Sequence, residues 1–304
     1  MGNMKVIKEW TILVPWGKIA LISFGNLDGD KVLVVHGRQD SAATFLPLLE
    51  LLPEKYHYVA FDMPGNGMSD PFPIGVKLQR FHFLGALELV VESLGWRDFT
   101  YMAHSMGCEQ GLFYNAVYPG RISRFVLLDV IPTLQRLQVH DHAEYQAVFY
   151  NDYYENYHKD NFQVKLYSKE DAVQAVMRAR GLTRLQAELI LSRNLIPAGG
   201  DKFRLSWDRR LKLPAPQNYP NEYYYELFKS CPPTLVVSAS EGSGAHKDGL
   251  PGAQWLVSEL ERTLAHFKVV TVVGNHDVHF IHPEKVASYV APFLERKVFD
   301  KSKL

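Results

Sequence analysis

Residues 101–107 read Tyr-Met-Ala-His-Ser-Met-Gly, and this stretch is the strongest single indication of the fold. A strand-like run leads into it, and the residues after it, Cys108 to Tyr118, can form a helix. A serine in such a strand–turn–helix, with small residues two positions before and after it, matches the nucleophile-elbow pattern small-x-Ser-x-Gly. The flanking residues are small because Cβ atoms would collide in so tight a turn. Taken alone, the stretch fits a candidate nucleophile, Ser105, and a chance serine in a turn equally well.

Length and composition narrow the class of protein. The chain has 304 residues, enough for one large α/β domain with an insertion. Lys plus Arg and Asp plus Glu number 33 each, which gives a net charge of +0 and argues against a nucleic-acid-binding protein. With only two cysteines, the chain is expected to be intracellular and reduced. No apolar run approaches the length of a membrane span.

The last three residues are Ser302, Lys303 and Leu304. This tripeptide is a peroxisomal address that an import receptor reads. We therefore expect a peroxisomal location, with a cytoplasmic fraction as the alternative, and the import receptor as a partner.

Upstream of the elbow, residues 31–36 form a β-branched run that ends in His36 and Gly37, as expected for a strand buried on both faces. A glycine just past such a strand lets the backbone bend over the sheet edge. The N–H of Arg38 would then join the N–H of Met106 as an oxyanion donor, and His36 would brace the loop. An ordinary turn is the alternative. Residues 62–70, Asp-Met-Pro-Gly-Asn-Gly-Met-Ser-Asp, follow the next strand and lack the Gly-Lys-Ser/Thr of a phosphate loop.

Strand and helix patterns alternate through residues 1–130 and again through 230–304, which predicts a doubly wound, mostly parallel α/β sheet. Between them, residues 131–229 show helical patterns instead, so we expect an inserted helical cap. We expect its aromatic residues Tyr145, Phe149 and Tyr153 to line the entrance to a site, although ordinary packing explains such a stripe as well.

Four motifs occur in one order: His36-Gly37, the glycine loop of residues 62–70, the Ser105 elbow and a late histidine, His276. In this the chain resembles the α/β-hydrolase superfamily over nearly its whole length. More closely, it resembles the serine hydrolase-like proteins, through residues 14–17, 274–279 and 283–287. Some of these proteins are associated with peroxisomes. The resemblance implies an α/β-hydrolase fold and a reaction that requires neither cofactor nor metal.

The resemblance places the general base at His276, just after the last strand and ahead of a Pro-Glu that opens the final helix. His279 is the second choice, with packing as its alternative role. A metal site formed by His276, His279 and His282 is a weaker alternative, because no Glu or Cys accompanies them as in zinc motifs.

The acid that orients the base has three candidates. Asp129 ends the strand after the elbow helix, Glu241 lies one residue ahead of the usual acid position in a later loop, and Asp248 lies further along that loop. Asp129 is favoured slightly, because its strand is expected to lie beside the elbow strand.

These residues predict a serine hydrolase that acts on an ester or thioester through an acyl-enzyme on Ser105. The substrate is expected to be a small, apolar acyl compound, and the peroxisomal tail makes a lipid-derived one plausible. Two alternatives stay open: a cofactor-free oxygenase or lyase that uses His276 and Asp129, and a non-catalytic ligand-binding protein.

Overall fold

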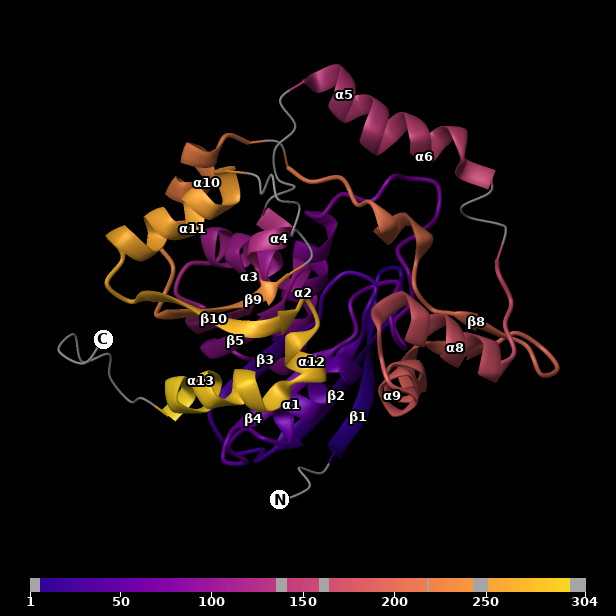
Figure 1. Ribbon diagram of the computed structural model, residues 1–304, viewed down its shortest axis with the longest axis horizontal. Helices are drawn as coiled ribbons and strands as arrows, with labels where there is room; N and C mark the ends of the chain where they lie inside the picture. Colours follow the sequence, from indigo (N-terminus) through magenta and orange to yellow (C-terminus); the bar gives the residue numbers. More distant parts are fainter. Residues whose placement is uncertain (1–5, 135–140, 159–163, 218, 243–250, 296–304) are drawn as a thin grey trace.

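An eight-stranded sheet runs through the computed structural model of the chain (Figure 1). The structure describes residues 6–134, 141–158, 164–217, 219–242 and 251–295. The strand order is β1-β2-β4-β3-β5-β6-β9-β10. The pairs β1–β2 and β2–β4 are antiparallel and the other neighbours are parallel, which confirms the predicted mostly parallel sheet.

The bounds of the elements follow the sequence patterns closely. The strands are β1 (Val6–Val14), β2 (Gly17–Gly25), β3 (Lys31–Val35), β4 (His57–Phe61), β5 (Phe99–His104), β6 (Ile122–Leu128), β7 (Leu195–Pro197), β8 (Phe203–Leu205), β9 (Thr234–Glu241) and β10 (Phe267–Asn275). The helices are η1 (Ala42–Phe45), α1 (Leu46–Leu49), α2 (His82–Leu94), α3 (Met106–Val117), α4 (Ile131–Leu134), α5 (His142–Gln146), η2 (Ala147–Asn151), α6 (Asp152–Glu155), α8 (Lys169–Arg180), α9 (Arg184–Asn194), η3 (Arg209–Lys212), α10 (Asn221–Phe228), α11 (Pro251–Thr263), α12 (Val278–Ile281) and α13 (Pro283–Glu295).

Helices cover both faces of the sheet. On one face α2, α3, α10 and α11 pack on side chains of the strands, and on the other α1, α12 and α13 do so (Figure 1). The central strands β3 and β5 are almost wholly buried, as their continuous apolar runs predict. Because parallel strands end at the same edge, the loops after β3, β5, β6 and β10 meet there.

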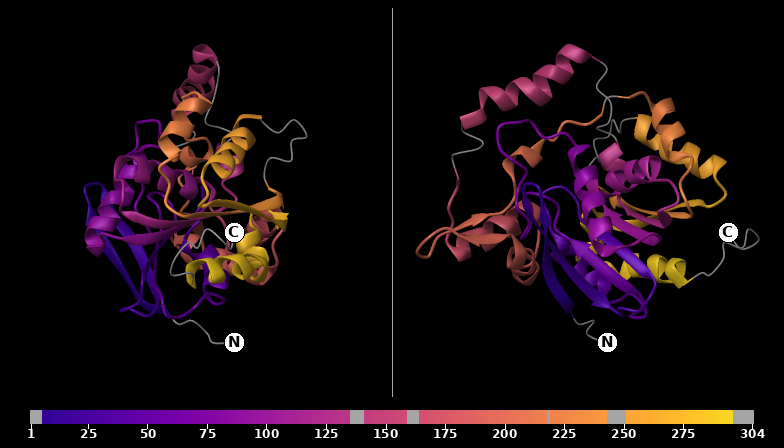
Figure 2. Two further views of the ribbon diagram at one scale, coloured as in Figure 1. Left: turned by 90° about the vertical axis from the view of Figure 1, so that its left-hand side faces the viewer. Right: turned by 180° about the vertical axis from the view of Figure 1, so that it is seen from behind.

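Residues 131–229, the predicted cap, connect β6 to β9. Helices α8 and α9 share a small apolar core of their own, which also takes in Phe280 from α12. Helices α5 and α6 stand away from the sheet in both views of Figure 2. One difference from the sequence analysis is the antiparallel pair β7–β8, whose turn contains Gly199 and Gly200 at φ 97° and 55°. Glycine adopts such positive φ values at little energetic cost. The adjacent glycines are therefore the feature of the sequence from which this hairpin could have been predicted. That residues 131–229 form a separate domain stays a prediction.

Candidate active site

The predicted elbow has the expected backbone. Ser105 lies between β5 and α3 with φ 50° and ψ −122°, a conformation that non-glycine residues rarely adopt. Gly107 has no room for a side chain, since a Cβ there would lie 2.6 Å from the carbonyl oxygen of His36. The strained turn presents the Ser105 hydroxyl above the strand ends.

Three side chains from distant parts of the chain form one hydrogen-bonded line. Nε2 of His276 lies 2.9 Å from Oγ of Ser105, and Nδ1 of His276 lies 2.6 Å from Oδ2 of Asp129. The structure therefore brings together the predicted nucleophile, base and favoured acid. This is the arrangement in which an imidazole takes a proton from a serine while a carboxylate fixes its tautomer.

Asp129 is held rigidly at the end of β6, next to the elbow strand. It is 2% exposed, and its Oδ1 accepts a hydrogen bond from the N–H of Ala239 at 3.0 Å. A Cβ on Gly242 would lie 2.8 Å from Oδ2 of Asp129, so the loop after β9 passes close to this carboxylate. Glu241 is exposed at the end of β9. The third candidate, Asp248, lies outside the described residues.

The proposed oxyanion loop follows β3. His36 is buried and neutral: burial lowers its pKa, Nε2 accepts from the N–H of Met63 at 2.8 Å, and Nδ1 donates to the carbonyl of Gly37 at 2.7 Å. A Cβ on Gly37 would lie 2.8 Å from Nδ1 of His104. His36 therefore braces the loop that carries the backbone N–H of Arg38. The Arg38 side chain lines the cavity and donates through Nη1 to the backbone carbonyl of Lys212 in the cap.

The histidines after β10 differ sharply in environment. His276 keeps a side chain that is 24% exposed, whereas His279 is fully buried and its ring packs 4.1 Å from that of His104. Burial lowers the pKa of His279 to about 3, and neither of its ring nitrogens has a hydrogen-bond partner. His104 donates through Nε2 to the carbonyl of His276 at 2.9 Å. Within the part of the chain that the structure describes, no cluster of three potential metal ligands occurs.

Sequence reasoning missed Thr133 in α4. Its Oγ1 lies 3.2 Å from Oγ of Ser105, close enough to compete with His276 for the serine hydroxyl. No motif marks this threonine, because it reaches Ser105 only through the packing of α4 against the elbow.

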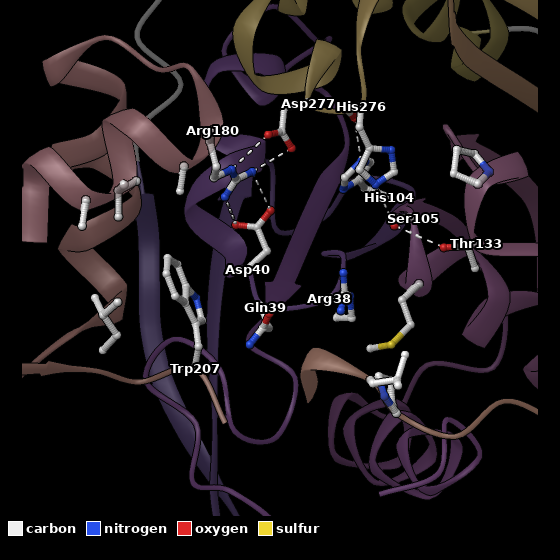
Figure 3. A pocket seen from close by; sticks show the side chains of 18 of the residues that line it. Arg38, Gln39, Asp40, His104, Ser105, Thr133, Arg180, Trp207, His276 and Asp277 are labelled. Carbon is white, nitrogen blue, oxygen red and sulfur yellow. Dashed lines mark hydrogen bonds and ion pairs between the residues drawn. The ribbon is translucent and has the colours of Figure 1, made fainter. Parts of the chain in front are cut away.

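A cavity of about 530 Å³ opens over Ser105 and His276 (Figure 3). Its polar wall comes mainly from core loops and its apolar wall mainly from the cap. The apolar lining from the cap comprises Pro132, Tyr167, Ala175, Val176, Ala179, Leu205, Trp207, Leu213 and Pro214, and the elbow adds Met106.

The prediction for the cap aromatics was wrong in its choice of residues. Among the described residues, Tyr167 and Trp207 line the cavity, and Tyr145, Phe149 and Tyr153 do not. Tyr145 instead packs on Phe149 and donates through its hydroxyl to the carbonyl of Pro216. Tyr153 packs under Nζ of Lys77, a residue of the core, so the stripe contributes to packing within the cap and between cap and core. Among all the residues that the structure describes, no helix is long and apolar enough to cross a bilayer.

Comparisons with known proteins agree with this fold. Residues 30–283 match the family described as the alpha/beta hydrolase fold. Human serine hydrolase-like protein 2 is 27% identical over 95% of each chain, and a zebrafish serine hydrolase-like protein is 29% identical over 98% of this chain and 91% of its own. Among solved structures, a hypothetical protein from Pseudomonas aeruginosa PAO1 superimposes with a TM-score of 0.80 at 26% identity, over 95% of this chain and all of the other.

Proposed function

The chain belongs to the α/β-hydrolase fold family, and on that premise we propose that it is a serine hydrolase that cleaves a carboxylic ester or thioester. The observation that carries the proposal is the Ser105–His276–Asp129 line beneath a cavity of about 530 Å³. Relatives named serine hydrolase-like support the coarser statement, a hydrolase. Fold alone would not support the finer one.

The proposed reaction follows from the positions of these atoms. Oγ of Ser105 attacks the substrate carbonyl while Nε2 of His276 takes the hydroxyl proton. The tetrahedral oxyanion accepts hydrogen bonds from the backbone N–H groups of Met106 and Arg38. His276 then gives the proton to the departing alcohol or thiol, which leaves an acyl-enzyme on Ser105. Water, deprotonated by His276, releases the acid and regenerates the serine.

The cavity supports an apolar acyl substrate. Its cap side is lined by side chains such as Val176, Leu205 and Trp207, which cannot solvate a charged chain. The acyl chain would lie along this wall, with its carbonyl at Ser105. We expect esters with medium-length acyl chains to be better substrates than acetyl esters.

A fluorophosphonate probe followed by peptide mass spectrometry tests the nucleophile, and a series of acyl esters and acyl-CoA thioesters tests the substrate. We expect one adduct, on Ser105, and turnover that Ser105→Ala abolishes. An adduct on another residue of active protein would refute the assignment. If Ser105→Ala retains a base-driven oxygenation or lyase reaction, the alternative enzyme class is correct. Ligand retention without turnover would indicate a binding protein.

We also propose peroxisomal import through Ser302, Lys303 and Leu304, a proposal that rests on sequence because these residues lie outside the described ones. A fluorescent protein fused ahead of the chain should give peroxisomal puncta, and the same fusion without Leu304 should be diffuse. Puncta that persist after the deletion would exclude the tail as the address.

A further inference from the structure

An arginine of the cap reaches into the active-site cavity without touching the three proposed catalytic residues. Arg180 is the last residue of α8, and Gly181 at φ 66° ends the helix there. Its guanidinium projects toward the core and lies between Asp40 and Asp277 (Figure 3). The Arg180 side chain is only 18% exposed. A charge so far removed from water must be stabilised by paired groups of the protein rather than by solvent.

Each carboxylate meets two nitrogens of the guanidinium. Nε and Nη2 of Arg180 donate to the two oxygens of Asp277 at 3.0 and 2.7 Å. Nη1 and Nη2 donate to the two oxygens of Asp40 at 3.3 Å each. Burial opposes the charge of Arg180, but the attraction of both carboxylates outweighs it and raises the arginine pKa. A planar, double fork of this kind fixes direction as well as distance, which a lysine cannot do.

The two carboxylates belong to the two loops that the proposed reaction needs. Asp277 is the residue directly after His276, and Asp40 lies two residues after Arg38. Between Arg38 and Asp40, Gln39 adopts φ 52°, a strained conformation that surrounding contacts must hold. Arg180 thus ties the loop of the base and the loop of the oxyanion donor to each other and to the cap.

We propose that Arg180 is a positioning residue that sets the distance between the His276 loop and the oxyanion loop once the cap is seated on the core. The inference rests on the proposed function. Its consequence is that the cap, besides shaping the cavity, takes part in aligning groups that belong to the core. Since displacement of reacting groups by about 1 Å can cost on the order of 100-fold in rate, such alignment matters chiefly for turnover.

The chain offers a matched control in Arg193, near the end of α9. Arg193 also joins cap to core through two carboxylates: Nη2 lies 2.8 Å from Oδ2 of the buried Asp62, and Nη1 lies 2.5 Å from Oε1 of the partly exposed Glu9. Its side chain is 5% exposed, and it does not line the cavity. If Arg180 has a purely structural role, substitutions of the two arginines should affect stability and turnover alike. If Arg180 is a positioning residue, only its substitution should lower turnover beyond the effect on stability.

The test compares Arg180→Lys with Arg193→Lys in the full chain, with ester kinetics and the rate of Ser105 labelling by a fluorophosphonate. Both are measured at a temperature where circular dichroism shows each variant folded. We expect Arg180→Lys to lower kcat roughly 10- to 100-fold with KM changed little, and to slow labelling in parallel. Arg193→Lys should lower thermal stability but leave kcat and labelling near those of the unchanged protein. A binding series with a boronic acid inhibitor, which mimics the tetrahedral state, should show weaker binding only for Arg180→Lys.

Asp277→Asn and Asp40→Asn are second variants in case Arg180→Lys does not fold. Each keeps one carboxylate on Arg180, and each should lower kcat more than KM. Equal losses in the Arg180 and Arg193 variants, or losses that follow thermal stability alone, would overturn the positioning role while leaving Ser105 labelling of the unchanged protein intact. If the unchanged protein is neither labelled nor active, the proposed function falls and the positioning role falls with it.

Discussion

The strand ends of the central sheet and the cap contribute to the same cavity in different ways. The sheet supplies the proposed reacting groups, whose places depend on the backbone: Ser105 follows β5, Asp129 follows β6 and His276 follows β10. The cap supplies surface, through side chains such as Tyr167 and Trp207. The contrast suggests that changes in the core loops should alter turnover, whereas changes in the cap should alter which substrate is preferred. Arg180 is the point where this division should fail.

The largest effect is expected from Asp129→Asn. Losing the acid that orients the imidazole lowers turnover by roughly four orders of magnitude in a serine protease, so a comparable loss of kcat is expected here with the fold preserved. Glu241→Gln, at an exposed position, should cost little. Kinetics on one ester, with circular dichroism as the check on folding, give the ranking. The reverse ranking would move the acid to Glu241, and two neutral changes would favour Asp248 or a Ser–His dyad.

Filling the apolar wall should change selectivity rather than chemistry. Ala175 lines the cavity from α8, so Ala175→Phe should lower kcat/KM for long acyl esters relative to acetyl esters by about 10- to 100-fold, the range in which apolar pockets discriminate. Arg178→Phe, on the same helix but outside the cavity lining, is the control. If both variants keep the ratio of kcat/KM values for long acyl and acetyl esters of the unchanged protein, the acyl chain does not lie along α8.

Acidic pH should lower the free energy of unfolding of the protein through protonation of His279 in the unfolded chain. Because burial lowers its pKa to about 3 while the unfolded chain titrates near 6.5, only the unfolded state gains a proton between these values. The free energy of unfolding should therefore fall as pH drops below about 6.5, by up to about 1.4 kcal/mol per pH unit from this group.

Urea unfolding of the His279→Phe variant at pH 6.5 and pH 5 tests this. The drop in unfolding free energy between the two should be roughly 2 kcal/mol smaller than in the unchanged protein. His142→Phe, at an exposed position in α5, should leave the drop as it is. Identical drops in all three proteins would mean that His279 is already protonated, or equally neutral, in both states.

The smallest effect concerns the stripe that was first expected to face the substrate. Tyr145→Phe removes a hydrogen bond from the tyrosine hydroxyl to the carbonyl of Pro216 and should lower stability by about 1 kcal/mol. The ratio of kcat/KM values across the ester series should not move. A shift in that ratio would show that this part of the cap contacts substrate.

Sequence alone determined the parts of the protein that depend on local backbone. The elbow at Ser105 needs small neighbours in a strand–helix turn, and the buried strands need continuous β-branched runs, so both leave a readable pattern. The position of Asp129 also followed, because consecutive parallel strands end side by side at one edge. The alternation of strand and helix patterns predicted the mostly parallel sheet that the structure has.

Only the tertiary structure decided which side chains from distant segments meet. Burial separates His276, which reaches Ser105 from the turn after β10, from His279 in α12, which packs against His104, although the two are only three positions apart in sequence. Thr133 approaches Ser105, and Trp207 lines the cavity in place of Tyr145, through packing that leaves no periodic mark in the chain. The same holds for Arg180, whose partners lie 140 and 97 residues away in sequence. Local patterns constrain φ, ψ and the buried face of each element, but contacts between elements depend on how their surfaces pack, and many sequences share the same local pattern.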